Sequence, residues 1–217
     1  MFASVAQRLV VEYGHPTLGN YRNPVREILY IVLSAKTTDL LYRRAHRQLW
    51  TKYPSLTEID GATEKQVFDC IRCAGLGQKR AKQIKRIVRS LMKDFGSNPG
   101  RSLRKLDPQS AYSYLIALPG VGPKSAFCIM SMSLDVDVFA VDVNVQRIAE
   151  RLGAIPRGLK HHQAQNRLPS MVPMGRSREL HVGMVVHGRT ICLPRNPRCG
   201  ECVLLDLCGF GKRRTSA

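Results

Sequence analysis

The chain has 217 residues, 44% of them hydrophobic, which suits one or two compact domains with a substantial core. Its 34 Lys and Arg outnumber 16 Asp and Glu, and the formal net charge of +18 indicates a polyanionic partner, either nucleic acid or an anionic membrane surface. No apolar run approaches the length of a membrane span, and residues 1–10 lack the long apolar segment of a secretory signal. We therefore expect a cytoplasmic protein with no membrane association.

Helical periodicity dominates the first quarter of the chain. Apolar residues over 25–33 mark a strongly hydrophobic core helix, which the polar segment 34–39 interrupts. Within that segment, Thr38 or Asp39 is a suitable N-cap for a second helix that runs to about residue 50. We therefore expect two consecutive helices joined by a short polar connection.

The clearest amphipathic pattern lies at residues 81–95. Lysines and arginines, Lys85 among them, occupy much of the surface of this segment, and Gly96 follows as a C-terminal stop. The opposite face carries apolar residues at helical spacing, namely Ile84, Ile87, Val88, Leu91 and Phe95. The pattern predicts a helix with one buried and one charged face.

The second half of the chain also predicts helices. Asp107 and Pro108 form a cap followed by a proline at the first helical position. Residues 135–141 are rich in β-formers but are too isolated to build a sheet. We therefore predict an all-α fold. The helices expected in this half cover 108–117, 124–134, a segment beginning near 144, a segment near 162, and 177–191.

Four of the seven cysteines lie close together near the end of the chain. Clustered thiols in a reducing compartment favour metal ligation over disulfides. Four thiolates can hold either zinc or an iron–sulfur cluster, and the spacing by itself leaves both open. The cysteines follow the spacing C-x6-C-x2-C-x5-C and are Cys192, Cys199, Cys202 and Cys208.

Three other residues invite a functional interpretation. Cys70 and Cys73 form a CxxC pair, but they lie in a helical pattern with no strand before it, so we interpret them as packing thiols rather than a redox pair. His187 precedes the four-cysteine loop and can hydrogen-bond one of its sulfurs.

The segment from Leu118 to Lys124 reads LPGVGPK and connects two predicted helices. Glycine permits positive φ and close backbone approach, so the turn Gly120-Val121-Gly122 can present main-chain amides at the positive N-terminal end of the next helix. A DNA phosphate suits such a site, and the contact would carry no sequence information. The alternative is an ordinary helix–helix connection. The complete sequence LPGVGPKSA, in a protein of net charge +18, favours the phosphate site.

Lys124 and Asp142 are the candidates for chemistry. A lysine in the first turn of a helix is electrostatically misplaced, and positive potential favours the neutral amine that nucleophilic catalysis needs. Asp142 comes 18 residues later, where it can simply cap the helix that follows. A capping role and a catalytic role are compatible for the same carboxylate.

The string LPGVGPKSA, followed by VDVNVQR, resembles the helix-hairpin-helix DNA glycosylases, and the endonuclease III branch in particular. The resemblance extends from about Pro24 to Cys208 and includes LSAKTTD, AGLGQKRA, HGRTIC and RCGECVLLDLC. It implies two helical domains with a DNA-binding cleft between them. Residues 19–134 would form a six-helix barrel domain with the helix-hairpin-helix, and 1–18 with 135–217 an iron–sulfur domain.

The resemblance implies a base excision repair enzyme that removes oxidised pyrimidines from double-stranded DNA and then acts as an abasic-site lyase. Lys124 would be the nucleophile that forms a Schiff base, and Asp142 the essential carboxylate. The four cysteines would hold a [4Fe–4S] cluster that shapes the loop carrying Arg195 and Arg198 for phosphate contacts. We further expect a monomer, associated with the nucleoid if the source is bacterial or archaeal.

Two further positions match residues that fill the space left by a flipped nucleotide in this branch. They are Lys36, where the branch carries glutamine, and Leu76, which would otherwise be an ordinary loop leucine. Pro123 and Asn144 also depart from the branch, in which a basic or polar residue and a histidine are usual. These departures suggest a different or narrower lesion range.

Two other functions stay open on the sequence. A monofunctional mismatch or alkylbase glycosylase would need no lysine nucleophile, so Lys124 argues against it. A non-catalytic helix-hairpin-helix DNA-binding protein would tolerate replacement of Lys124 without any change in behaviour.

Overall fold

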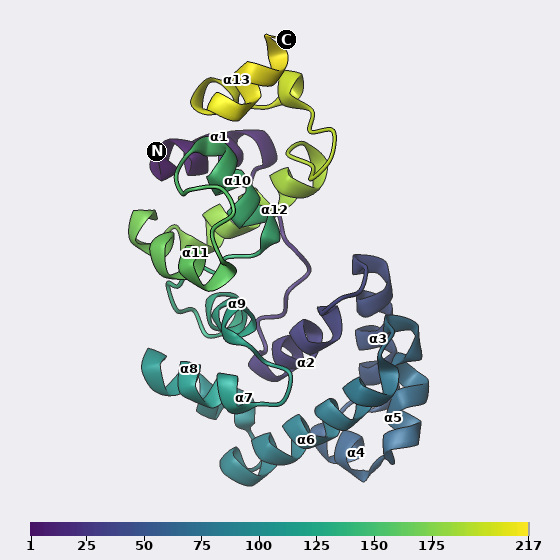
Figure 1. Ribbon diagram of the computed structural model, residues 1–217. Helices are drawn as coiled ribbons and strands as arrows, with labels where there is room; N and C mark the ends of the chain where they lie inside the picture. The colour runs from purple at the N-terminus through teal and green to yellow at the C-terminus, as the bar shows by residue number, and fades with distance from the viewer. Residues whose placement is uncertain (217) are drawn as a thin grey trace. The chain divides into compact units, whose positions relative to one another are not determined.

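The computed structural model describes residues 1–216, which form helices and irregular connections with no β-strand among them (Figure 1). The prediction of an all-α fold is confirmed, and residues 135–141 are irregular. No described helix is both long and apolar enough to cross a membrane. The helices are α1 (Phe2–Tyr13), α2 (Pro24–Ser34), α3 (Asp39–Lys52), α4 (Leu56–Gly61), α5 (Glu64–Ile71), α6 (Gly77–Phe95), α7 (Pro99–Leu103), α8 (Pro108–Ala117), α9 (Pro123–Ser133), α10 (Val143–Leu152), α11 (His161–Arg167), α12 (Ser177–Thr190) and α13 (Gly209–Thr215), with 3-10 turns η1 (Arg72–Ala74), η2 (Pro169–Met171), η3 (Cys199–Glu201) and η4 (Leu205–Leu207).

Two compact units divide the described chain. The terminal unit contains Met1–Gly19 and the residues from Asp137 onward, and the central unit is Asn20–Val136. The expected functional domains, 19–134 and 1–18 with 135–217, stay a prediction. Residue 217 lies outside the described residues.

The terminal unit has its own hydrophobic core. Helices α10 and α12 pack against each other, and α1 packs against α12. Their apolar faces meet because the buried residues recur at helical spacing, as Leu9 on α1, Ile148 on α10 and Leu180 with Met184 on α12 illustrate. The segment before α10 contributes Phe139, which is 2% exposed.

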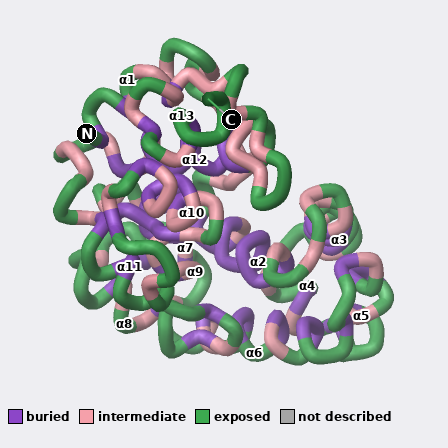
Figure 2. Tube along the Cα trace, turned by 45° about the horizontal axis from the view of Figure 1, so that its top comes forward, coloured by how far each residue is buried: buried purple, intermediate pink, exposed green. Residues whose placement is uncertain are grey.

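The central unit is built around α2, whose residues are almost all buried (Figure 2). Helices α3, α6, α7 and α9 pack against it, which explains why most of its sequence is apolar. Asn23 caps it with hydrogen bonds from the amides of Val25 and Arg26, and Pro24 occupies its first position.

The central unit contains eight α-helices in its described residues, where the resemblance implied six. The two extra elements are short: α4 spans six residues and α7 five. Each of α4 and α5 begins with a capping box, formed by Ser55 with Glu58 at α4 and by Thr63 with Gln66 at α5.

Other helix ends agree with the local sequence except at one cap. Asp107 caps α8 through the amides of Gln109 and Ser110, and Gly96 ends α6 with φ 64°. Helix α3 begins after Thr38 as expected, but the Thr38 side chain makes no capping hydrogen bond. The amphipathic segment 81–95 lies within α6, which begins four residues earlier, at Gly77.

Lys85 is the one residue of α6 whose predicted exposure is clearly wrong. It is 3% exposed, and its Nζ donates to the carbonyl oxygens of Ile59 (3.1 Å), Ala62 (2.6 Å) and Asp60. These carbonyls end α4, where a cation meets both unpaired acceptors and the negative end of the helix dipole.

We expect Lys85→Met to lower the free energy of unfolding by about 3 kcal/mol, because methionine fills the space but leaves the α4 carbonyls without their donor. Urea unfolding followed by circular dichroism measures the change. Lys82→Met, at an exposed position on the same helix, is the control and should change stability by less than about 0.5 kcal/mol. Equal midpoints for the two variants would contradict the capping role.

Candidate functional site

The turn between α8 and α9 contains the two glycines singled out from the sequence. Gly120 has φ 87°, and a Cβ at this position would lie 2.6 Å from Nε2 of Gln83 on α6. The positive φ therefore favours glycine at position 120, and any larger residue would also have to displace the side chain of Gln83. Gly122 is the N-cap of α9 with φ −97°, a conformation open to other residues, and the space beside it is open because an added Cβ meets no atom within 4 Å.

Lys124 is the second residue of α9, directly after Pro123 at the first helical position, and is half-buried. The first-turn amides of a helix lack intrahelical partners, so the Lys124 side chain starts where an anion is favoured. Helix α2 packs against α9 and carries Glu27, a fully buried carboxyl group. Glu27 was not predicted as a site residue, although a charged residue inside the apolar pattern of α2 is a recognisable signal.

Burial raises the pKa of Glu27 to about 7, and three features oppose that rise. The backbone N–H of Tyr21 (2.7 Å) and the side chain of Asn20 donate hydrogen bonds to the carboxylate, and the positive charge of Lys124 also stabilises it. A buried carboxyl group that responds to the charge of Lys124 therefore lies in the same unit.

Glu27 predicts a pH dependence of stability. Its pKa is about 7 in the folded chain and 4.5 as the ordinary value, so between these limits the folded state binds more protons than the unfolded state. The free energy of unfolding should thus fall as pH rises from 4.5 to 7, by on the order of 3 kcal/mol from this group. Denaturant unfolding across this range measures the slope.

Glu27→Gln should remove that contribution to the slope, whatever its effect on absolute stability, because glutamine does not titrate. Glu58→Gln, at an exposed position of the same unit, serves as the control and should keep the wild-type slope. Parallel pH profiles for wild type and Glu27→Gln would show that the buried carboxyl group does not carry the effect.

Lys36 and Leu76 occupy two turns of the central unit with the same unusual backbone. Lys36 has φ 53° and Leu76 φ 49°, and both side chains are exposed, Leu76 by 58%. Left-handed backbone is unfavourable for residues with a Cβ, so the surrounding structure must hold both turns. Leu76 immediately precedes α6, the helix that also contacts the Gly120 turn through Gln83.

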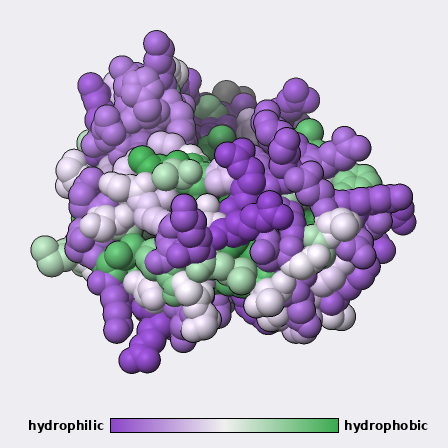
Figure 3. All heavy atoms as spheres, turned by 90° about the horizontal axis from the view of Figure 1, so that it is seen from below, coloured by the Kyte–Doolittle hydropathy of each residue, from purple (hydrophilic) through white to green (hydrophobic). Residues whose placement is uncertain are grey.

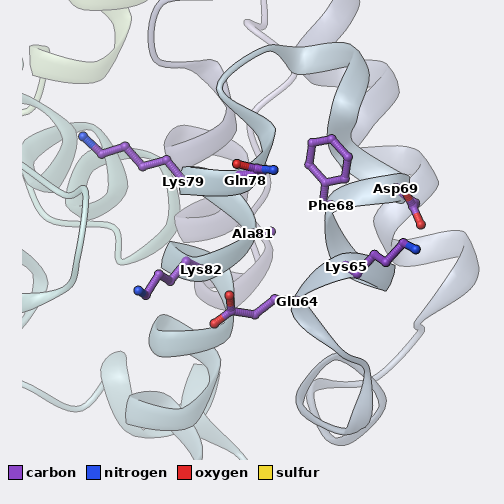
Figure 4. Close-up of a pocket in the computed structure, with 8 residues that line it drawn as sticks. All are labelled: Glu64, Lys65, Phe68, Asp69, Gln78, Lys79, Ala81 and Lys82. Carbon is purple, nitrogen blue, oxygen red and sulfur yellow. The ribbon is translucent and has the colours of Figure 1, made fainter.

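A surface pocket of about 690 Å³ lies between α5 and α6, on the helix pair that carries the Leu76 turn (Figure 4). The side chains of Lys79 and Lys82 extend from α6 away from α5, and the side chain of Phe68 belongs to α5. A Cβ at Gly77 would lie 2.7 Å from the Phe68 ring, so glycine allows the close contact that fixes the start of α6.

Asp142 is the N-cap of α10, which confirms the capping interpretation. Its Oδ1 accepts hydrogen bonds from the amides of Asn144 and Val145, both at 2.8 Å, and its Oδ2 accepts one from Nδ2 of Asn144 at 2.9 Å. Three donors hold the half-buried carboxylate in one orientation and stabilise its ionised form. The catalytic role of Asp142 stays a prediction.

Hydrogen bonds continue from Asp142 to the four-cysteine loop. Arg147, one turn further along α10, donates from Nη2 to Oδ1 of Asn144 and to the carbonyl of Gly188, both at 2.8 Å, and from Nε to the carbonyl of Cys192 at 2.9 Å. Gly188 permits this contact, because a Cβ there would lie 2.7 Å from Cβ of Asn144. Asn144, a departure from the branch, therefore links the carboxylate to Arg147, which the sequence analysis missed.

The four-cysteine loop forms one site in the terminal unit. All four cysteines line a single small cavity, and Cys208 begins α13. The described residues contain no group of three His, Cys, Asp or Glu side chains placed to hold a single metal ion. Four thiols around one cavity are nevertheless the donor set that an iron–sulfur cluster takes.

Three of the four sulfurs lie within hydrogen-bond distance of a nitrogen, an arrangement that stabilises negative charge on sulfur ligands. Burial lowers the pKa of His187 to about 4, so its ring is neutral, with Nδ1 2.9 Å from the Tyr13 hydroxyl. The expected contact of His187 with a ligand sulfur is confirmed. The pairs are Arg151 Nη1 with Cys192 Sγ (3.1 Å), His187 Nε2 with Cys202 Sγ (3.4 Å), and Gly211 N with Cys208 Sγ (3.3 Å).

The first segment of the loop exposes two predicted DNA contacts, Arg195 and Arg198. Arg151 of α10 contacts the backbone of this segment, since its guanidinium donates hydrogen bonds to the carbonyls of Leu193 (2.8 Å) and Pro194 (3.1 Å). The face drawn in Figure 3 is largely hydrophilic with separate hydrophobic patches, in keeping with the net charge of +18.

The predicted site residues thus fall into two groups, each within one unit. The central unit holds the Gly120–Gly122 turn, Lys124, Lys36 and Leu76, and α6 follows the Leu76 turn and contacts the Gly120 turn through Gln83. The terminal unit holds Asp142, the four cysteines, Arg195 and Arg198, joined through α10.

Comparison with known proteins agrees with this geometry. Residues 29–174 match the HhH-GPD superfamily of base excision DNA repair proteins, and residues 192–208 match the iron–sulfur binding domain of endonuclease III. The second match begins and ends on cysteines of the loop, and the predicted [4Fe–4S] cluster is confirmed.

Relatives similar to this chain over most of their length support the same branch. Endonuclease III of Thermotoga maritima is 29% identical over 214 residues, covering 99% of this chain and 95% of the relative. Endonuclease III of Bacillus subtilis is 29% identical over 194 residues, covering 89% and 84%. A solved trapped endonuclease III–DNA covalent intermediate has a TM-score of 0.84 at 26% identity and covers 98% of this chain and 96% of that one.

Proposed function

Because this chain belongs to the HhH-GPD superfamily of base excision DNA repair proteins, in its endonuclease III branch, we propose that it is a DNA glycosylase with abasic-site lyase activity. Its substrate is double-stranded DNA that contains oxidised pyrimidines, and it acts as a monomer. The net charge of +18 supports a polyanionic substrate.

The observation that carries the proposal is the place of Lys124. It lies in the first turn of α9, directly after the Gly120–Gly122 turn, so a phosphate held by the turn brings the DNA backbone to the lysine side chain. The neutral form of the Lys124 amine is the nucleophile that attacks carbon.

The damaged nucleotide is first flipped out of the duplex, because its sugar is unreachable inside the stack. The lone pair of Lys124 Nζ then forms a bond to C1′ while the bond from C1′ to the base breaks, and the base leaves with that electron pair and takes up a proton. The amine loses a proton and the sugar ring opens, which gives a lysine–sugar Schiff base. Loss of a proton from C2′ then expels the 3′ phosphate.

We assign Asp142 the stabilisation of the positive charge that develops on the sugar as the base leaves. Its carboxyl group is oriented by three hydrogen bonds from the start of α10, two of them from backbone amides. Arg195 and Arg198 are assigned to phosphate contacts, which their exposure on the four-cysteine loop permits.

The iron–sulfur cluster supplies structural cross-linking of the loop when bound, and the bond-breaking steps use the side chains above. Arg151 also donates hydrogen bonds to two carbonyls of this loop, so contacts within the protein stabilise the loop in addition to the bonds between its cysteines and the cluster. The exposed arginines are thereby presented from a fixed backbone.

A panel of duplexes with single lesions tests the proposal, with thymine glycol, dihydrouracil, uracil, 8-oxoguanine and a preformed abasic site. Wild type should release thymine glycol, an oxidised pyrimidine, and dihydrouracil, which is likewise saturated at the 5,6-bond, and should cleave the abasic strand. Asp142→Asn should slow base release by roughly 10²- to 10⁴-fold, the range typical for loss of one charged catalytic group. Asp137→Asn, another carboxylate of the same unit, is the control.

The outcomes separate the alternatives. Release of uracil or an alkylated base without strand cleavage would replace the proposal with a monofunctional glycosylase. Tight binding to all duplexes without any product would favour the non-catalytic DNA-binding protein.

A further inference from the structure

Two exposed turns of the central unit share a strained backbone and a common neighbour. Lys36 (φ 53°) and Leu76 (φ 49°) are two of the four non-glycine residues with positive φ in residues 1–216. They are separated by 40 positions in the sequence, and each would cost of order 1–2 kcal/mol if nothing held it. Some contact must therefore keep both turns in this conformation.

Arg80 makes that contact from the first turn of α6. Its side chain is only 2% exposed, one guanidinium nitrogen donates to the carbonyl of Ala74, and the other donates to the carbonyl of Ala35. Ala35 directly precedes Lys36, and Ala74 lies two residues before Leu76. One planar group thus spans the two strained turns.

The chemistry of arginine explains why this residue is suited to the position. A buried cation must have its donors satisfied, and the fixed fork of a guanidinium reaches two acceptors in a defined geometry. The partners are main-chain carbonyls rather than a carboxylate, so the charge of Arg80 remains available to stabilise phosphate nearby. The start of α6, which carries Arg80, is itself held by packing, since Gly77 lies against the ring of Phe68 and the side chain of Gln83 lies against Gly120.

We propose that Arg80 is a positioning residue that couples the Lys36 turn to the Leu76 turn, so that the two side chains enter the duplex together when a nucleotide is flipped out. This inference rests on the proposed function and deepens it. Arg80 acts through the side chains of Lys36 and Leu76, which fill the space that the flipped nucleotide leaves in the DNA duplex. Bond breaking at the sugar is assigned to Lys124.

The proposal predicts a defect that depends on DNA structure. An abasic site in a duplex requires the space in the helix to be filled, but an abasic site in a single strand does not. We expect Arg80→Met to lower the cleavage rate on duplex abasic DNA by at least about 10-fold and to change the rate on single-stranded abasic DNA by less than about 2-fold. Arg86→Met, an exposed arginine on the same helix, should leave both rates unchanged.

Arg80→Lys keeps the charge but replaces the two-pronged fork with a single ammonium group. It should show the same preference for single-stranded substrate to a smaller degree, and it carries the test if Arg80→Met does not fold. A purely structural role would lower both rates together in line with the loss of folded protein, measured by circular dichroism on the same samples.

A double-mutant experiment tests the coupling itself. With Arg80 present, the effects of Lys36→Ala and Leu76→Ala on the rate of duplex cleavage should be non-additive. Once either side chain is removed, the other has already lost its partner, so the second change has a smaller effect. In the Arg80→Met background the two changes should become additive. Additivity in both backgrounds, or equal losses on duplex and single-stranded DNA, would overturn the proposal.

Failure of the proposed function gives a different result. In that case wild type cleaves neither form of abasic DNA, and no ratio between substrates exists. A wild type that cleaves both forms, with an Arg80→Met variant that cleaves both equally well, rejects the role of Arg80 alone.

Discussion

We expect Lys124→Ala to abolish the covalent adduct that borohydride traps between the protein and abasic DNA, and to lower strand cleavage by roughly 10³-fold or more. The reason is that alanine has no lone pair to attack C1′, so neither the Schiff base nor the elimination that depends on it can form. Folding should be little affected, since the Lys124 side chain is half-buried at the start of α9 and the helix keeps Pro123 at its first position.

The adduct is measured by denaturing electrophoresis after reduction, with equal amounts of folded protein. Lys105→Ala is the matched control, because Lys105 is an exposed lysine of the same unit outside the Gly120 turn. It should trap as wild type does. An adduct of normal yield in Lys124→Ala would transfer the nucleophile to another amine, and no adduct with wild type would end the lyase proposal.

Cys199→Ala should cost the protein its iron and much of the stability of the terminal unit. Metal binding to a site that exists only in the folded chain contributes directly to folding, so loss of one ligand of four removes on the order of 5 kcal/mol or more. Cys199 is only half-buried, so the packing lost by the substitution is small beside the lost ligation. DNA affinity should fall as well, because the loop with Arg195 and Arg198 loses its cross-link.

Iron content per chain and thermal unfolding measure these effects. Cys73→Ala is the control, since Cys73 is a half-buried thiol of the central unit whose Sγ lies 3.7 Å from the Leu41 carbonyl. It should retain full iron and a near-normal Tm. Full iron in Cys199→Ala, or equal loss in Cys73→Ala, would contradict ligation by the four-cysteine loop.

Hydrogen bonds that run from Asp142 through Asn144 and Arg147 to Cys192 connect the cluster loop with the carboxyl group assigned to base release. Removal of the cluster should disturb Cys192, whose carbonyl accepts from Arg147, and Arg147 in turn holds Asn144 beside Asp142. Loss of iron is therefore expected to slow base release more than it weakens binding to an undamaged duplex.

Local sequence determined a large part of this protein. The helices follow from apolar periodicity, their starts from caps such as Asp107 and Asp142, and the cluster loop from four cysteines at close spacing. These features depend on residues a few positions apart, and short-range hydrogen bonding and burial of one helix face suffice to set them.

Only the tertiary structure decided which charged residues are buried and what they join. Glu27, Arg80, Lys85 and Arg147 stand in helices where a charge ordinarily faces solvent. Glu27 is buried in a core helix, Lys85 ends α4, Arg80 joins two strained turns and Arg147 joins Asp142 to the loop. Most of their partners are 6 to 45 positions away and are main-chain carbonyls, which every residue possesses. A carbonyl leaves no mark in the sequence, so such contacts become visible only once the chain has folded.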